Sequence, residues 1–193
     1  MNELLRHALL KMERRDQQLC EEVLTAVVSG GEDGAAEVVE KMNADRKRNV
    51  EALQETIDAY GWPTVSAVGD DGAEAAWIIA QHADHDPGFQ ESVLTLMRPL
   101  LRRNEVPKKC YAYLSDRVAV NNGRPQPFGT QFLEVAGRMV PRPIMDRARL
   151  NRRRTAYGLE PFEEYDRRFA GSPREVIRRG MTESEDDAAR SAA

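Results

Sequence analysis

The chain has 193 residues, of which 41% are hydrophobic and 31% charged, and its formal net charge is −4. These values are typical of one globular domain with a heavily charged surface and a sizeable core. No apolar run approaches the ~20 residues that span a bilayer, and the charged first residues lack the apolar segment of a signal peptide. We therefore expect a cytoplasmic protein with no membrane partner.

Apolar residues at helical spacing predict two long helices in the first sixty residues. The first covers 3–28, and the second covers 36–60 and ends where Gly61 follows it. The sequence SGGEDGAA at 29–36 predicts a turn between them. Asp16 falls on the apolar stripe of the first helix, and a carboxylate that faces a core needs a partner because burying it alone is very costly.

A third helix is predicted around residues 75–80, where every side chain is apolar, as is typical of a helix at the centre of a fold. A fourth helix is predicted over 87–103, because Pro87 suits a first helical turn and Asp86 suits its N-cap. The other predicted segments are a helix over 107–120, a long irregular loop near 121–135, two short helices over 143–157 and 161–169, and short strands, if any, at 64–68 and 117–120.

These segments predict a mainly α fold, with a single compact multi-helix domain over 1–170. The residues 171–193 end in TESEDDAARSAA, which contains no large apolar side chain. Such a segment cannot bury enough surface to offset the entropy of ordering it. We therefore predict a flexible, disordered acidic tail over 171–193.

The stretch QHADHDPGFQ, residues 81–90, contains two histidines, two aspartates and two glutamines. An acid–base site needs one histidine held by a carboxylate, and His82 with Asp84 or Asp86 satisfies that requirement. A metal site needs two or three converging ligands, for which His82, Asp86 and Asp16 are the candidates. Structural explanations also stay open, because Asp86 before a proline is often a helix cap and His82 can be a satisfied core histidine.

Glutamines form a second signal, since Gln81, Gln90, Gln126 and Gln131 lie beside apolar or turn residues. A primary amide donates and accepts at once, so it suits either a polar ligand or buried backbone. Arg117 lies next to the inward stripe of its helix. It can neutralise a buried carboxylate such as Asp16 or clamp an anionic substrate.

Several short motifs resemble an uncharacterised bacterial family, defined only as a domain of unknown function. The similarity covers roughly residues 10 to 165, and Phe128 departs from it where tyrosine is the expected residue. The motifs are GWP at 61–63, S-x-V-G at 66–69, WIIAQHADHDPGFQ at 77–90, DRV at 116–118, QPFGTQ at 126–131, P-I-x-D at 143–146 and R-x-x-x-G-L at 154–159.

The resemblance implies no reaction, but it implies which positions share one site. The positions are His82, Asp84, Asp86, Gln90, Asp116, Arg117, Gln126, Thr130 and Gln131. Within this set, we take His82, Asp84, Asp86 and Arg117 as catalytic candidates and Gln90, Asp116, Gln126, Thr130 and Gln131 as candidates for substrate binding.

The leading hypothesis is a small enzyme with a polar His/Asp/Gln/Arg pocket that acts on a small polar or anionic substrate. Acid–base chemistry and metal-assisted hydrolysis are both open, with a divalent metal as the one cofactor considered. No nucleotide cofactor is expected, because phosphate-binding glycine motifs are absent. The alternative is a binding or interaction module whose polar cluster is structural. A homo-oligomer stays open, and the acidic balance argues against a nucleic-acid partner despite three consecutive arginines at 152–154.

Overall fold

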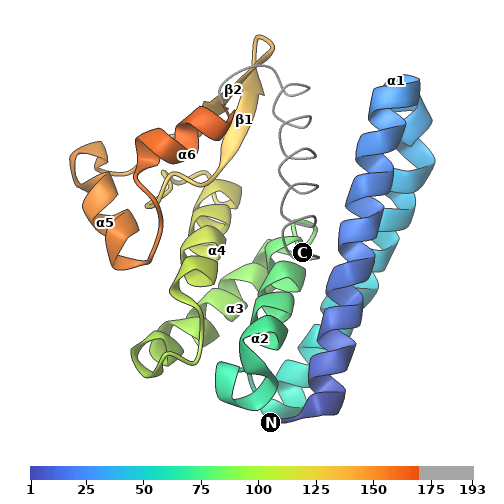
Figure 1. The fold of residues 1–193 in the computed structure, drawn as a ribbon, viewed down its shortest axis with the longest axis vertical. Coiled ribbons are helices and arrows are strands. Elements are labelled where there is room, and N and C mark those ends of the chain that lie inside the picture. The colour runs from blue at the N-terminus through green and yellow to red at the C-terminus, as the bar shows by residue number, and fades with distance from the viewer. Residues whose placement is uncertain (170–193) are drawn as a thin grey trace, which may run out of the picture.

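The computed structural model describes residues 1–169, except the side chains of 30–33, and the predicted tail at 171–193 lies outside the described residues. The described chain is mainly α-helical, as predicted, with one small two-stranded sheet (Figure 1). In this part of the chain, no helix combines the length and the apolar character needed to cross a membrane.

The first element, α1 (Glu3–Tyr60), is a helical pair whose two halves run antiparallel (Figure 1). Arg46 Nε lies 2.6 Å from Asp16 Oδ1, whereas 30 residues of straight helix would separate them by about 45 Å. The chain therefore reverses between them, where the sequence predicted a turn, although helix is assigned through 29–36. Asn2 caps the first half by accepting a hydrogen bond from Leu5 N.

The central helix is α2 (Val65–Gln81), which starts earlier than predicted and bends at Gly69, where φ is 78°. The short strand suggested at 64–68 is therefore wrong, because the helix begins there. The sequence around Gly69 looks like a turn although it lies within a helix. The positive φ of Gly69 changes the direction of the helix without ending it. Beyond the bend, Ala75, Ala76, Ile79 and Ala80 are buried, as the apolar run predicted.

Helix α3 (Pro87–Leu100) begins where Asp86 Oδ1 accepts a hydrogen bond from Phe89 N at 2.9 Å. The predicted extension to residue 103 is a 3-10 turn, η1 (Leu101–Arg103). Helix α4 (Lys108–Asn121) matches its prediction and buries Tyr111, Leu114 and Val118, so the strand suggested at 117–120 is also wrong.

The sequence reading missed a β-hairpin of strands β1 (Phe132–Val135) and β2 (Arg138–Pro141), which pair antiparallel with Val135 opposite Arg138. Ala136 and Gly137, the two residues of its turn, both have positive φ, at 51° and 77°. The usual sequence signal of a hairpin turn of this kind is Asn-Gly or Asp-Gly. Ala-Gly carries no such signal, and β1 was therefore placed inside the irregular loop near 121–135.

After the hairpin come η2 (Arg147–Arg149), α5 (Leu150–Ala156) and α6 (Phe162–Phe169). The helix predicted from residue 143 starts only at Leu150, because Ile144 bridges to Gln126 in extended backbone. Gln126 N donates to Pro143 O, and Met145 N donates to Gln126 O. These bonds tie the loop to the chain that follows the hairpin.

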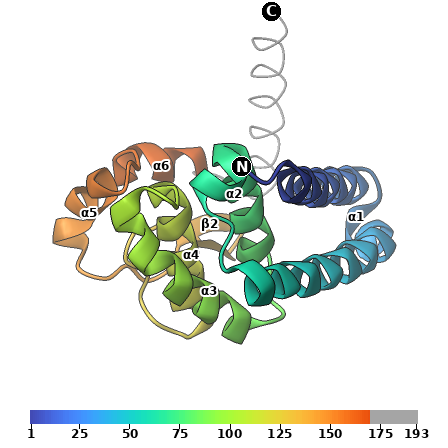
Figure 2. The same cartoon turned by 90° about the horizontal axis from the view of Figure 1, so that it is seen from below.

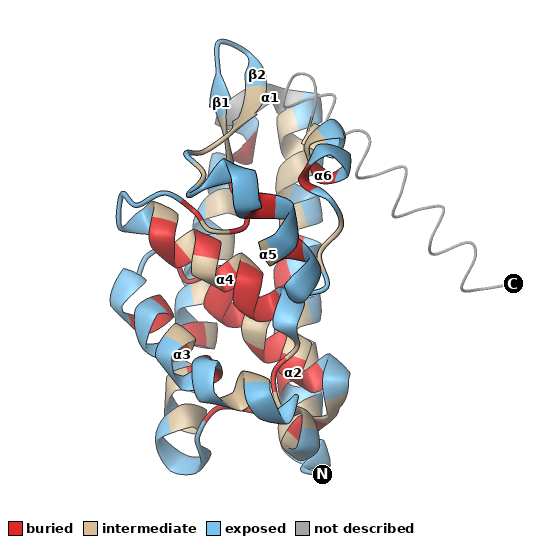
Figure 3. Ribbon diagram, turned by 90° about the vertical axis from the view of Figure 1, so that its left-hand side faces the viewer, coloured by how far each residue is buried: buried red, intermediate tan, exposed pale blue. Residues whose placement is uncertain are grey.

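Helix α2 lies between the α1 pair and α4, with α3 beside α4 (Figure 2). Buried positions gather along α2 and α4 (Figure 3). Leu9, Leu53, Val68, Ala76 and Leu114 belong to one core cluster that joins α1, α2 and α4. The polar end of α2, with Gln81 and the residues that follow it, therefore emerges between α1 on one side and α4 on the other.

Candidate functional site

A buried carboxylate holds the first histidine of the QHADHD stretch. Asp16 is 3% exposed, and its Oδ2 lies 2.6 Å from His82 Nδ1. Arg46 Nε donates to the other oxygen, Oδ1, also at 2.6 Å. Asp16 therefore has the partner that its place on an apolar stripe required, and α1 supplies both ends of that ion pair. We call Asp16, Arg46 and His82 the histidine site.

The two neighbours of Asp16, Arg46 and His82, decide its charge. Burial by itself would raise the pKa of this carboxyl, but hydrogen bonds from His82 and Arg46 outweigh burial and lower the pKa to about 2. Asp16 is therefore ionised at neutral pH and acts as an acceptor only. The short bond then assigns the proton on His82 to Nδ1, which leaves Nε2 of the neutral ring with its lone pair.

The histidine site is partly open to solvent, since the side chains of His82 and Arg46 are 26% and 20% exposed. Arg46 Nη2 also donates to Cys20 Sγ at 3.2 Å. Burial raises the pKa of the Cys20 thiol, so this sulfur is a neutral neighbour and not an activated nucleophile. Both cysteines of the chain are free thiols.

The sequence reading missed Arg46 and Cys20. A signal for Arg46 was present, because it lies four residues before Val50 and seven before Leu53, both buried on α1. That spacing places it on the apolar stripe of its helix, as Asp16 lies on the facing stripe. Two opposite charges on two apolar stripes predict a buried pair once the helices are known to be adjacent.

A second cluster forms on the other side of the same turn. Arg117 on α4 donates to both oxygens of Asp84, at 2.8 and 2.7 Å. Arg117 Nη1 also donates to Gln131 Oε1 at 2.9 Å. Asn121, which the sequence reading missed, donates to Asp84 at 3.1 Å and to Gln90 Oε1 at 2.8 Å. We call these residues the arginine cluster; Arg117 neutralises Asp84 there and not Asp16.

Gln90 belongs to the arginine cluster but serves the backbone. It is fully buried, and its Nε2 donates to the carbonyls of Ala80 and Gln81 at 3.1 and 3.2 Å. These are carbonyls at the end of α2, which lack partners within the helix. Gln90 therefore acts as a side-chain cap of α2. Its Oε1 accepts a hydrogen bond from Asn121, so both polar atoms of the side chain are already bonded within the protein and none is left for the predicted substrate contact.

The loop 126–131 is held by a third group of buried polar residues. Asp116 Oδ1 and Oδ2 accept hydrogen bonds from Phe128 N and Thr130 N, both at 2.7 Å. Gln126 is fully buried; its Nε2 donates to Gln131 O and Arg142 O, and its Oε1 accepts from Gln131 N. Thr130 Oγ1 accepts from Gln131 Nε2 at 3.0 Å.

Asp116 is unusual because it is buried and forms no ion pair with any residue that the structure describes. Burial raises its pKa to about 6, against the two backbone hydrogen bonds that lower it. Arg154, itself 1% exposed, lies on the far side of the loop and donates to Phe128 O. The predicted substrate residues Asp116 and Gln126 thus fix the loop and present no polar group to solvent.

Two buried polar atoms of α2 have no hydrogen-bond partner within the described residues. They are Gln81 Oε1 and Trp77 Nε1, which lie one helical turn apart on α2. Gln81 is 7% exposed. An unpaired buried acceptor costs free energy unless something else binds it, so Gln81 Oε1 is an acceptor whose hydrogen-bonding capacity the described residues leave unused.

Asp86 and His85 are exposed; Asp86 contacts the arginine cluster only through its backbone carbonyl, which accepts a hydrogen bond from Gln90 N at 3.2 Å. Asp86 caps α3, so the structure does not bring it to His82. Among the described residues, no group of three His, Cys, Asp or Glu side chains converges as metal ligands would. Of the three proposed metal ligands, Asp16 and His82 meet, and Asp86 lies apart.

The fold and site together define a mainly α protein with a helical-pair N-terminus and a carboxylate-held histidine at the end of its central helix. The sequence model of the Family of unknown function (DUF6624) matches residues 3–172, so the chain belongs to that family. Neither the curated proteins nor the solved structures contain a significant match to this chain.

Proposed function

We propose that this protein is an acid–base enzyme, a hydrolase of small anionic substrates, with His82 as its general base. One observation carries the proposal: a buried, ionised Asp16 holds Nδ1 of a partly exposed imidazole at 2.6 Å. A histidine kept only for packing has no need of this arrangement at the solvent boundary. Free thiols at Cys20 and Cys110 support a reducing compartment such as the cytoplasm.

The arrangement supports a simple proton cycle. His82 Nε2 takes a proton from water, and the hydroxide that forms adds to a carbonyl or phosphoryl centre of the substrate. Asp16 stabilises the imidazolium because its negative charge already lies against Nδ1. The imidazolium then returns its proton to the leaving group, so the enzyme ends in its starting state.

Arg46 and Gln81 supply the contacts that we assign to substrate. Arg46 uses Nε and Nη2 on Asp16 and Cys20, and its Nη1 has no hydrogen-bond partner among the described side chains. A guanidinium edge beside the base suits an anionic group on the substrate. The unpaired Oε1 of Gln81 suits a hydroxyl or amide donor on the same molecule.

A metal at the histidine site is disfavoured by charge. Arg46 Nη2 lies 3.3 Å from His82 Nδ1, and both oxygens of Asp16 already accept hydrogen bonds. A divalent cation on Asp16 would therefore sit against a guanidinium of like charge. We assign the base to the imidazole itself.

The test uses two generic substrates, the anionic p-nitrophenyl phosphate and its neutral counterpart p-nitrophenyl acetate, with His82→Gln as the main variant. We expect wild-type turnover and a loss of at least a hundredfold in His82→Gln, the range typical of a removed general base. His85→Gln is the matched control, because His85 is exposed three residues away. No wild-type rate above background on either substrate, or an unchanged rate in His82→Gln, would overturn the proposal.

The second candidate is a binding module whose polar residues are structural, and the closed bonding of Gln90 and Gln126 favours it. Fully satisfied buried networks fix the register of packed elements. The two candidates differ at His82, which NMR can follow because the chain has three histidines. A His82 ring that titrates in the wild type supports the enzyme, and one that stays neutral from pH 4 upward supports the module.

A further inference from the structure

The structure contains a cavity of about 580 Å³ between α3, α4 and the loop that follows α4. Its size falls within the range of small-molecule sites, about 300–1,000 Å³. Its α4 wall includes Ser115, which lies about 200° around the helix from Arg117. The cavity therefore opens on the side of α4 away from the arginine cluster, and nothing in the proposed function uses it.

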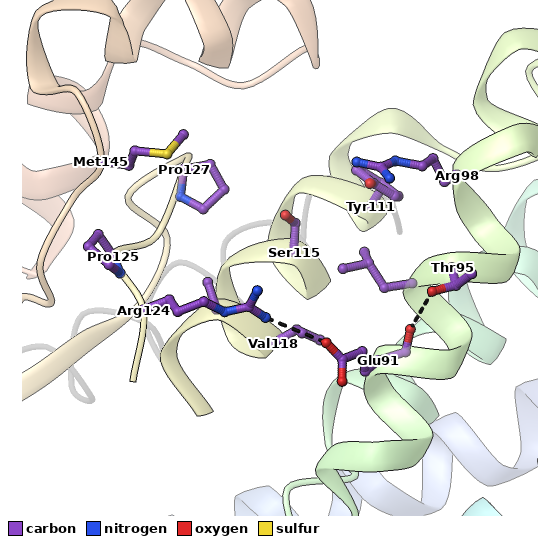
Figure 4. A pocket seen from close by; sticks show the side chains of 12 residues that line it. Glu91, Thr95, Arg98, Tyr111, Ser115, Val118, Arg124, Pro125, Pro127 and Met145 are labelled. Carbon is purple, nitrogen blue, oxygen red and sulfur yellow. Dashed lines mark hydrogen bonds and ion pairs between the residues drawn. The ribbon is translucent and has the colours of Figure 1, made fainter. Parts of the chain in front are cut away.

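Six of the twelve residues that line the cavity are apolar. Figure 4 shows α3 and α4 supplying one side and the loop with Pro125 and Pro127 supplying the other, with Met145 beside them. Met145 is 48% exposed, which is unusual for so apolar a side chain. The apolar lining residues are Leu94, Val118, Ala119, Pro125, Pro127 and Met145.

The polar residues of the cavity carry a net positive charge. Arg124 pairs with Glu91 at 3.6 Å across the two sides (Figure 4), and both side chains are largely exposed. Arg98 also lines the cavity, and no carboxylate among the described residues pairs with it. The chain as a whole has a net charge of −4. An arginine without a carboxylate partner at the edge of a partly apolar cavity is therefore complementary to an anion.

Three hydroxyl groups lie in the lining, and that of Thr95 donates to Glu91 O at 3.0 Å. Tyr111 and Ser115 point into the cavity from α4 (Figure 4), and no hydrogen bond within the described chain uses either hydroxyl. Tyr111 is held in place by stacking on Tyr157, with ring centroids 5.9 Å apart. An aromatic wall with a free hydroxyl beside a cation offers the kind of polar groups that orient a ligand within a pocket.

We propose that this cavity is a second ligand site, which binds a small organic anion with an apolar body and one carboxylate. The body packs on Leu94, Val118 and the two prolines. The carboxylate pairs with Arg98 and accepts a hydrogen bond from Tyr111 or Ser115. The site is separate from the histidine site and does not depend on its chemistry.

The experiment compares 3-phenylpropionate with its neutral counterpart, 3-phenylpropan-1-ol, by titration calorimetry and by NMR shift mapping. We expect the carboxylate to bind about tenfold tighter, since a charged hydrogen bond contributes of that order when partly exposed. Arg98→Gln should remove this difference. Arg14→Gln is the matched control, because it removes the same charge from an exposed position on α1.

Two further variants keep the result specific. Ala119→Phe fills the cavity from α4 and should abolish binding of both probes while circular dichroism shows retained helix. His82→Gln should bind the carboxylate like the wild type. The proposal is overturned if neither probe binds, if both bind equally, if Arg14→Gln weakens binding as Arg98→Gln does, or if Ala119→Phe folds and still binds. Loss of binding in His82→Gln would place the ligand at the histidine site, which overturns this proposal and leaves the proposed function intact.

Discussion

Replacing Gln126 with glutamate keeps the shape of the side chain but exchanges its amide donor, Nε2, for an oxygen that accepts hydrogen bonds. In the wild type, Nε2 donates to Gln131 O at 2.8 Å and to Arg142 O at 3.0 Å. A glutamate oxygen at that place faces two carbonyl oxygens with no proton between them. Because Gln126 is fully buried, the new carboxyl must be neutral to stay inside.

The magnitude follows from two costs. Holding a glutamate neutral at pH 7 costs about 4 kcal/mol, because its ordinary pKa is near 4.3. The neutral acid then has one O–H for two carbonyls, so one buried carbonyl loses its donor at a cost of about 1–3 kcal/mol. The sum approaches the whole stability of a typical domain, about 5–15 kcal/mol.

Urea unfolding at pH 7 and pH 5, followed by circular dichroism, measures this loss. Gln126→Glu should lose at least about 5 kcal/mol relative to wild type at pH 7, and about 3 kcal/mol less than that at pH 5, since protonation becomes easier. Gln18→Glu makes the same chemical change at an exposed position of α1 and should stay within about 0.5 kcal/mol. A Gln126→Glu protein as stable as wild type at pH 7 would refute the structural role of Gln126. Gln126 would then again be a candidate for substrate binding.

Three other substitutions test single contacts. Asp116→Asn removes a carboxyl whose pKa burial raises to about 6. A raised pKa gives wild type a contribution to stability that is present below pH 3.8 and is lost as the pH rises through 6. Between pH 4 and 7, urea titrations should therefore show that wild type loses up to about 3 kcal/mol of stability relative to the variant. The argument fails if the difference is flat with pH or grows in the opposite direction. Asp86→Ala should cost about 1 kcal/mol of stability through the lost cap of α3 and leave the titration of His82 unchanged; a shifted His82 pKa would contradict its placement. Gly129→Ala should lose more than about 2 kcal/mol in thermal unfolding, because Gly129 has φ +74° and a Cβ there would lie 2.9 Å from the Phe162 ring, and a melting temperature equal to that of wild type would show that the loop repacks freely.

Local patterns predicted the helices well where apolar spacing was regular. The inward face of α4 and the N-cap of α3 follow from residues within one or two turns of each other. The same kind of reasoning failed for the β-hairpin, because its Ala136-Gly137 turn lacks the usual sequence signal and its strands are short. It also failed at Gly69, where one residue of positive φ turned an apparent connector into part of a helix.

The candidate site divides in the same way. The sequence identified His82 and Asp16 as polar residues on faces built for burial and grouped them only as candidate metal ligands; for acid–base chemistry it paired His82 with Asp84 or Asp86, its neighbours in the chain. The structure pairs it with Asp16, 66 residues away, and gives Asp84 to Arg117. His82 and Asp84 have different partners because α2 ends at Gln81. The turn that follows directs His82 toward α1 and Asp84 toward α4.

The sequence alone determined that the chain is mainly helical and that Asp16 needs a partner, and it directed attention to the polar residues at 81–90. Those conclusions need only the free-energy cost of burying charge and the periodicity of a helix. Only the tertiary structure decided which polar groups meet, which glutamines serve the backbone, and that a positively charged cavity lies behind α4. These depend on contacts between segments far apart in the chain, whose geometry no local pattern encodes.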